Sequence, residues 1–215
     1  MKFALVYISL CLFAFQSCFH FQSESGKVEA DSLPVRGEMD GHGYVDLGLS
    51  VLWATSNVSA DPNDTIGDFV SYGELTPKSR YLPTNYMYQD TMLKEISGTQ
   101  YDYATHVWGG RWRTPTFGEY EELFRKCEKH WNESLKALVA VGPSGDSLCL
   151  PAHGYKYDNE HKHPDDGGYF WSSTQNIYYS EYAWRLGFIP TWNGVDDVCL
   201  YYGYQVRPVI DKRKR

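Results

Sequence analysis

The chain has little positive charge for its length, and this excludes one broad class of partner. Its 215 residues include 20 lysines and arginines against 27 aspartates and glutamates, which gives a net charge of −7. A surface that binds nucleic-acid phosphates needs a basic patch. The only basic run is Lys212-Arg-Lys-Arg at the end of the chain, and a terminal run of this kind is usually solvated. Nucleic acid is therefore not an expected partner.

Cysteine is too scarce for a complete disulfide framework. Cys11 and Cys18 belong to the N-terminal apolar stretch or its end, which leaves Cys127, Cys149 and Cys199, an odd number. Cys127 continues an apolar helical pattern and Cys149 stands between two leucines, so both are expected to be small buried hydrophobic residues. No serine or cysteine lies in a motif typical of a nucleophile.

Long hydrophobic runs are also missing, except at the start of the chain. Lys2 is followed by an apolar stretch over residues 3–15, which is typical of a secretory signal and too short to span a bilayer as an ordinary helix. Ser17 and Cys18 follow, and a small residue before a cysteine at this point resembles a bacterial lipoprotein signal. On this interpretation Cys18 becomes the lipidated first residue of an anchored protein. The alternative is a plain signal peptide that is cut nearby.

The rest of the sequence indicates a simple domain organisation. Residues after Cys18 are polar and without periodicity up to about Asp40, which favours a flexible tether between membrane and domain. The predicted parts are a signal peptide (1–17), a lipidated N-terminus and tether (18–41), one domain (42–210) and a basic tail (211–215).

Aromatic residues and glycine are abundant: 18 tyrosines, 7 tryptophans and 19 glycines indicate a fold rich in loops. The clearest element is a helix that starts at Thr116, because Thr116 and Glu119 form a capping box. Tyr120, Leu123, Phe124 and Cys127 then fall at i, i+3, i+4 and i+7, one apolar stripe for a core.

Most other segments read as short strands. Apolar residues alternate along 45–51, where Gly48 can open a hairpin, and a turn at 142–146 separates the strand patterns 137–141 and 147–150. Further strands are expected at 68–74, 169–174, 182–188, 198–202 and 205–209, with one helical turn at 102–107. The predicted fold class is α+β with antiparallel sheet, and the segments 171–174 and 205–209 are expected to pack near Trp108 and Trp112.

Six sequence blocks occur in an order that resembles a known family. They are YVDLGLSVLWAT (44–55), YGE (72–74), WGGRWRTPT (108–116), LPAHGY (150–155), FWSST (170–174) and VRPV (206–209). Together they look like the paralogous-domain lipoproteins of Bacteroides and Fibrobacter. That family is similar to the formylglycine-generating-enzyme branch of the C-type-lectin-like fold, and the resemblance implies this fold for about residues 42–210.

A narrower resemblance concerns the end of the chain. WSSTQ (171–175), AWRLGF (183–188) and VRPV (206–209) look like the variable proteins of diversity-generating retroelements, in which template adenines are copied with errors. Asparagine codons altered in this way cannot yield Trp, Lys, Glu, Gln or Met. Between Asn176 and Tyr204 the residues outside the reachable set are only Glu181, Trp184 and Trp192.

Segment 176–204 has the composition of a binding surface, since tyrosine and tryptophan supply rigid contact area and small polar residues supply hydrogen bonds. Trp184, Leu186 and Phe188 alternate like a buried strand face, which would turn Arg185 outward; Tyr182 and Trp192 could serve either the site or the core. The predicted ligand-binding residues are Ile177, Tyr178, Tyr179, Ser180, Tyr182, Arg185, Gly187, Ile189, Thr191, Trp192, Asn193, Asp196, Asp197, Tyr201, Tyr202 and Tyr204.

Two segments of the sequence could instead bind a metal ion. His153, His161, His163, Asp165 and Asp166 could form a metal site, but their loop sequence is also typical of turns. The aspartates of segment 57–68 could bind calcium, yet the spacing lacks the EF-hand glycine and terminal glutamate, which favours an Asx-rich turn.

Two arginines and one cysteine bear on the remaining alternatives. Arg113 and Arg207 could bind anions or be buried against loop carbonyls, and the second interpretation is preferred. The resemblance to formylglycine-generating enzymes implies an active-site cysteine pair near the end of the chain, where only Cys199 is found.

We therefore expect an exported, lipid-anchored protein of the outer membrane or cell surface that binds a protein or glycan ligand through 176–204. No catalytic residue, metal or cofactor is predicted. The alternatives are a metal-dependent or formylglycine-generating-like enzyme and a structural adhesin. A lectin-like fold does not by itself imply sugar binding.

Overall fold

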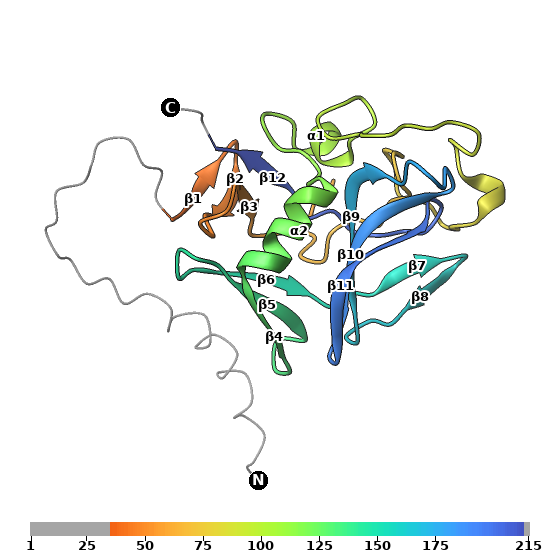
Figure 1. Cartoon of the computed structure of the whole chain (residues 1–215). Helices are drawn as coiled ribbons and strands as arrows, with labels where there is room; N and C mark the ends of the chain where they lie inside the picture. The colour runs from red at the N-terminus through yellow and green to blue at the C-terminus, as the bar shows by residue number, and fades with distance from the viewer. Residues whose placement is uncertain (1–34, 213–215) are drawn as a thin grey trace, which may run out of the picture. The chain divides into compact units, whose positions relative to one another are not determined.

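The computed structural model describes residues 35–212, and these form four small sheets with few helices (Figure 1). Every pair of named strands runs antiparallel. One sheet has the order β1 (Arg36–Met39), β2 (His42–Val45), β3 (Val51–Ala54) and β12 (Val209–Asp211). A second has the order β4 (Glu128–Asn132), β5 (Ala137–Val141) and β6 (Ser147–Pro151).

The sheet that carries most of the predicted site is built from three longer strands. Its order is β11 (Trp192–Cys199), β10 (Tyr182–Ile189) and β9 (Gly168–Gln175). The fourth sheet is a two-stranded ribbon of β7 (Tyr155–Tyr157) and β8 (Glu160–Lys162). Small antiparallel sheets with one clear helix confirm the coarse prediction of antiparallel strands and few helices.

The main helix, α2 (Phe117–Lys126), begins as its sequence predicts. The Thr116 hydroxyl accepts a hydrogen bond from the Glu119 amide, and the Glu119 carboxylate accepts one from the Thr116 amide. Tyr120, Leu123 and Cys127 of the apolar stripe are buried. The helical turn predicted near residue 102 is also present as α1 (Tyr103–Val107), capped by Asp102, and η1 (Pro83–Asn85) is a short 3₁₀ turn.

The largest core cluster lies where α2 meets the sheets. Tyr120 and Leu123 of α2 pack with Leu138 of β5 and with Phe170 and Leu186 of β9 and β10. Side chains removed from water in this way supply most of the stability of a small domain. One face of the β9–β10–β11 sheet is therefore fixed against the helix, while Tyr169, Trp171 and Ala183 on the opposite face belong to a second core cluster.

Trp53, Trp112 and Trp171 of the sequence blocks are buried, and Trp108 is half-buried. Trp171 is buried and donates from its indole nitrogen to the Val70 carbonyl at 2.8 Å. Trp112 is buried in a separate cluster with Ile210, and Trp108 lies against both clusters. The predicted proximity of the segments around Trp171 and Val209 to Trp108 and Trp112 is confirmed, since the backbone of Arg113 also pairs with that of Val209.

Several predicted boundaries are wrong. The tether was expected to reach residue 41, but β1 pairs with β2 from Arg36 onward, so this sheet includes residues assigned to the tether. The tail was expected to begin at residue 211, which instead belongs to β12. Residues 68–74 contribute only an isolated bridge at Val70 instead of a strand. The strand expected at 198–202 is β11, which starts six residues earlier, and strands β4, β7 and β8 were not predicted.

Two further predictions concern the N-terminal part of the chain. The signal segment and the lipidation site at Cys18 lie outside the described residues. Between residues 35 and 212, no helix is both long enough and apolar enough to cross a bilayer.

Candidate functional site

The predicted binding residues lie on and around the β10–β11 hairpin. Ile189 pairs with Trp192 across a two-residue turn, and the register continues without a break to Tyr182 opposite Cys199. Because successive side chains of a strand alternate, Leu186, Phe188 and Val195 face the core beneath α2. Arg185 and Asp196 are paired residues on the opposite face.

Trp192 lies flat on that opposite face at one end of the hairpin. Gly187 and Gly194 pair beneath it, and a β-carbon added at Gly194 would come within 2.9 Å of the indole ring. The two glycines therefore make the room that the ring occupies. Trp192 remains 45% exposed, so one face of the indole rests on the sheet and the side chain offers a rigid apolar surface to solvent.

Arg185 is held beside Trp192 by tyrosine rings and one carboxylate. Its guanidinium carbon lies 4.7 Å from the centre of the Tyr169 ring and 5.3 Å from that of Tyr204, and Nη2 donates to Asp196 Oδ2 at 3.0 Å. Nε and Nη1 of Arg185 and Oδ1 of Asp196 have no partner among the described residues. Burial raises the pKa of the Asp196 carboxyl, and the attraction of Arg185 opposes this shift.

Tyrosines from three elements pack behind Arg185. The Tyr169 and Tyr202 rings each stack on Tyr204 with centres 5.8 Å apart, and Tyr155 meets all three edge-on at 5.0–5.6 Å. Burial raises the pKa of Tyr204. These rings form a scaffold that holds Arg185 and the segment after β11 in place.

The other end of the hairpin carries a second exposed aromatic group. Tyr178 is 84% and Tyr179 62% exposed, and Ile177 and Tyr182 are exposed beside them. Asn176 orders this turn, because its side-chain oxygen accepts from the amides of Tyr178 and Tyr179 and its side-chain nitrogen donates to Asp197 at 2.6 Å. The exposed tyrosines thus project from a turn whose backbone is fixed.

The structure divides the predicted residues instead of gathering them into one patch. The ends of β10 are seven residue steps apart, about 23 Å in an extended strand, so the Tyr178 group and Trp192 are separate contact points. Two predictions of an accessible residue are wrong, since Gly187 lies under Trp192 and Tyr204 is 3% exposed and part of the core. The exposed members are Ile177, Tyr178, Tyr179, Ser180, Tyr182, Ile189, Thr191, Trp192 and Asn193, and the half-buried ones are Arg185, Asp196, Asp197, Tyr201 and Tyr202.

Three features of this region differ from the sequence expectation. Trp184 is only half buried and packs on Phe117 with ring centres 4.4 Å apart, because the register between β9 and β10 shifts between residues 183 and 185. Arg185 does turn to the face opposite the core but is covered by tyrosines. The sequence does not predict the supporting residues Tyr155, Tyr169 and Asn176; Tyr155 ends the block LPAHGY (150–155), and the other two lie within two residues of FWSST (170–174).

The histidine-rich loop does not form a compact cluster. His161 Nε2 lies 2.6 Å from the His153 carbonyl oxygen, while the His163 ring stacks on Tyr155. Burial lowers the pKa of His153. Within residues 35–212 no group of three histidine, cysteine, aspartate or glutamate side chains is placed to share a metal ion.

The aspartates of segment 57–68 are engaged in turns. Asp61 accepts from the Asn63 amide, Asp64 from the amides of Ile66 and Gly67, and Asp68 from Ala60 and Tyr103. This arrangement agrees with the Asx-rich turn that the spacing favours over a calcium loop.

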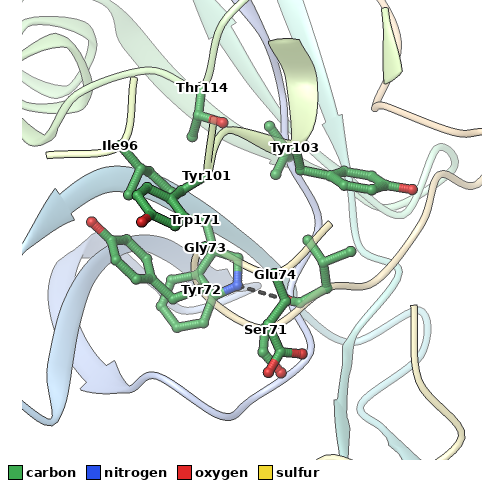
Figure 2. A pocket seen from close by; sticks show the side chains of 11 residues that line it. Ser71, Tyr72, Gly73, Glu74, Ile96, Tyr101, Tyr103, Thr114 and Trp171 are labelled. Carbon is green, nitrogen blue, oxygen red and sulfur yellow. Dashed lines mark hydrogen bonds between the residues drawn. The ribbon is translucent and has the colours of Figure 1, made fainter. Parts of the chain in front are cut away.

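A small hollow is lined in part by Trp171 (Figure 2). Its lining includes Tyr72, Glu74, Ile96 and Tyr103, and Glu74 donates from its backbone amide to the Ser71 carbonyl at 3.0 Å. The space suits little more than a single water molecule. The space is too small to hold an organic ligand.

Comparison with protein-family models, with curated proteins and with solved structures finds no match to this chain.

Proposed function

We propose that this protein is an exported, lipid-anchored surface protein whose single domain has a C-type-lectin-like fold and binds a protein or glycan ligand through 176–204. The observation that carries the proposal is the pair of exposed aromatic groups, Tyr178 with Tyr179 and Trp192, each held by a fixed backbone. Exposed aromatics on a rigid support favour binding, because little side-chain entropy is lost when they are covered.

The proposed lipid anchor at Cys18 has its own test. Replacement Cys18→Ser should abolish labelling of the protein by radioactive palmitate in the source bacterium and release it from the membrane fraction. Labelling that persists in the variant contradicts lipidation at this residue and favours an ordinary cleaved signal.

Retroelement-driven diversification belongs to the same proposal. Ile177, Tyr178, Tyr179 and Ser180 are all reachable from asparagine codons by adenine changes and all are exposed. DNA next to the gene should contain a near-copy of the codons for 176–209 that differs at adenines. A neighbourhood without such a copy contradicts diversification and leaves ligand binding to be judged separately.

Ligand binding is tested on glycan and protein arrays with the purified protein. The triple variant Tyr178→Ala, Tyr179→Ala, Trp192→Ala should lose at least tenfold of any array signal, because aromatic anchors dominate interface energy. A matched double variant, Met87→Ala with Leu135→Ala, removes exposed apolar side chains outside 176–204 and should bind like the wild type. Equal signals from the triple variant and the wild type would contradict the proposed binding face.

A further inference from the structure

The outer strand of the β9–β10–β11 sheet has a free edge. β11 pairs with β10 alone, and its eight residues have no second strand beside them within 35–212. The two-residue turn makes Ile189 and Trp192 the hydrogen-bonded closing pair. Since such pairs alternate, the backbone groups of Asn193, Val195 and Asp197 point away from β10. No backbone hydrogen bond of the described turns and loops involves those three residues.

This edge has only part of the usual protection against strand pairing. Natural proteins block long edges with proline, charged side chains, bulges or covering elements. The sequence WNGVDDVC contains neither proline nor lysine, and its two charges are both negative, so they disfavour an acidic strand but not a basic one. The register irregularity of the sheet lies between β9 and β10, and β11 pairs regularly throughout. An extended segment can therefore approach β11 along its length.

The side chains along the edge specify what such a segment would carry. Asp196 and Asp197 are adjacent and so point to opposite faces of the sheet. Asp196 forms an ion pair with Arg185 and keeps a second, buried oxygen without a partner among the described residues. Asp197 accepts a hydrogen bond from Asn176 and forms no ion pair within the described chain. Opposite charges in neighbouring strands attract, so two adjacent basic residues on the incoming strand would place one cation beside each carboxylate.

We propose that the ligand is an extended polypeptide segment that adds to β11 as a fourth strand, with a pair of lysines or arginines beside Asp196 and Asp197. Its ends reach the two exposed aromatic groups, Trp192 and the Tyr178 turn, which are one strand length apart. The proposal rests on the proposed function, since it names the ligand class of the same face. Main-chain hydrogen bonds supply affinity and the alternating side chains supply selectivity.

The other occupants fit the edge less well. A glycan has no regular row of amide donors and acceptors to match those of Asn193, Val195 and Asp197. A second copy of the chain, paired antiparallel through β11, would bring four carboxylates close together in the centre of the interface, and like charges across strands are destabilising. A basic strand from another protein satisfies both the backbone and the charges.

The test starts from a phage-displayed library of linear nine-residue peptides selected on the purified full-length protein. Selected peptides should contain adjacent basic residues and few prolines. The strongest is synthesised with a fluorophore, and its affinity is measured by anisotropy. A version with N-methyl groups on alternate backbone amides along the pairing edge keeps every side chain and should bind at least tenfold more weakly, because it cannot complete the strand ladder.

Protein variants separate backbone pairing from side-chain contact. Asn193→Pro removes an outward amide and places a ring on the edge, so it should weaken peptide binding at least tenfold, while Asn193→Ala loses the side chain but keeps the amide and should bind at least fivefold more tightly than Asn193→Pro. Asp197→Asn keeps an acceptor for Asn176 and should weaken binding severalfold. No enriched peptide, unchanged affinity after N-methylation, or equal binding by Asn193→Pro and Asn193→Ala would each overturn strand addition. If the arrays give a signal that depends on Trp192 and Tyr178 but the phage library yields no enriched peptide, strand addition is contradicted and the proposed function is retained.

Discussion

Arg113 and Arg207 both lie close to a proline in the sequence, yet their surroundings are opposite. Arg113 pairs with Glu119 at 2.6 Å and with Asp211. Arg207 is 2% exposed, donates from Nη1 to the Ala54 carbonyl at 3.2 Å and leaves Nε without a partner in the described chain. Burial lowers the pKa of Arg207 to about 10. Its contact with a backbone carbonyl agrees with the preferred interpretation of a buried arginine.

Replacing Arg207 should therefore lower the free energy of unfolding less than replacing Arg113. A buried charge without a counter-ion can be exchanged for an apolar side chain of similar length at little cost or with a gain of about 1–2 kcal/mol. Arg113→Met leaves Glu119 unpaired and should cost about 2–4 kcal/mol. Urea unfolding of the two methionine variants measures the difference. A larger loss for Arg207→Met than for Arg113→Met would show that Arg207 has a stabilising partner.

Glu122 should make stability depend on acid pH. Partial burial opposes its ionisation, but hydrogen bonds from Lys126 and from the Ser50 side chain and amide outweigh this and lower the pKa of Glu122 to about 2. Because the folded pKa lies below the unfolded value of about 4.3, the contribution is complete above that value and is lost as the pH falls toward 2.

The matching measurement is urea unfolding of Glu122→Gln at pH 7 and at pH 2.5. At pH 7 the variant should be about 1–2 kcal/mol less stable than the wild type, in line with hydrogen bonds to a charged group. At pH 2.5 most of this difference should vanish. Glu121→Gln changes an exposed neighbour on the same helix and serves as the control. A difference that persists undiminished at pH 2.5 would mean that ionisation of Glu122 is not its source.

At the scale of elements, the start of α2 depends on one side chain. Thr116→Ala removes the acceptor for the Glu119 amide and should destabilise the protein by about 1 kcal/mol, whereas Thr116→Ser keeps the acceptor and should stay near the wild type. Thermal unfolding monitored by circular dichroism compares the two. Equal loss in both variants would indicate that the methyl group, and not the cap, matters here.

The elements that could be predicted from sequence are those with local causes. α2 follows from its capping box and apolar stripe, and the β5–β6 hairpin follows from turn residues between two apolar runs. β11 was misplaced because its sequence, WNGVDDVC, has no apolar alternation and is a strand only through its pairing with β10. Residues 68–74 have the sequence pattern of a strand but form no ladder. Val70 makes one isolated bridge to Tyr204, and the Phe69 carbonyl accepts a hydrogen bond from the Tyr81 hydroxyl.

For the proposed site, the sequence predicts a segment, 176–204, and does not predict the arrangement of its residues. Composition predicts a contact role for Tyr178, which is exposed, but leaves Trp192 open between site and core, and only the structure shows that Trp192 is 45% exposed. Tyr204 has the same composition context, yet it is enclosed by Tyr155 and Tyr169 from elements far away in the chain. Tyr204 is buried only because the folded chain brings these distant elements together. The distance between the two exposed groups, the Tyr178 turn and Trp192, follows from the length of β10, which the sequence does not show.

At the scale of the whole molecule, the domain starts earlier than the first apolar alternation suggests. β1 pairs with β2, Arg36 forms an ion pair with Asp146, and the Met39 carbonyl accepts a hydrogen bond from the buried Trp112 indole at 3.0 Å. The ion pair and the indole hydrogen bond join β1 to distant parts of the chain and leave no local pattern, whereas the β1–β2 hairpin is local and closes through the turn Asp40-Gly41. β1 therefore belongs to the folding unit and not to a tether.

Two truncated chains test this boundary. A chain that begins at Val35 should unfold in urea with the same free energy as the full-length protein. A chain that begins at His42 loses β1 and leaves the Trp112 indole nitrogen without its acceptor, and an unpaired buried donor costs about 1–3 kcal/mol before lost packing is counted. We expect it to be at least 2 kcal/mol less stable. Equal stability of the two truncated chains would return residues 36–41 to the tether and place the true edge of the domain at β2.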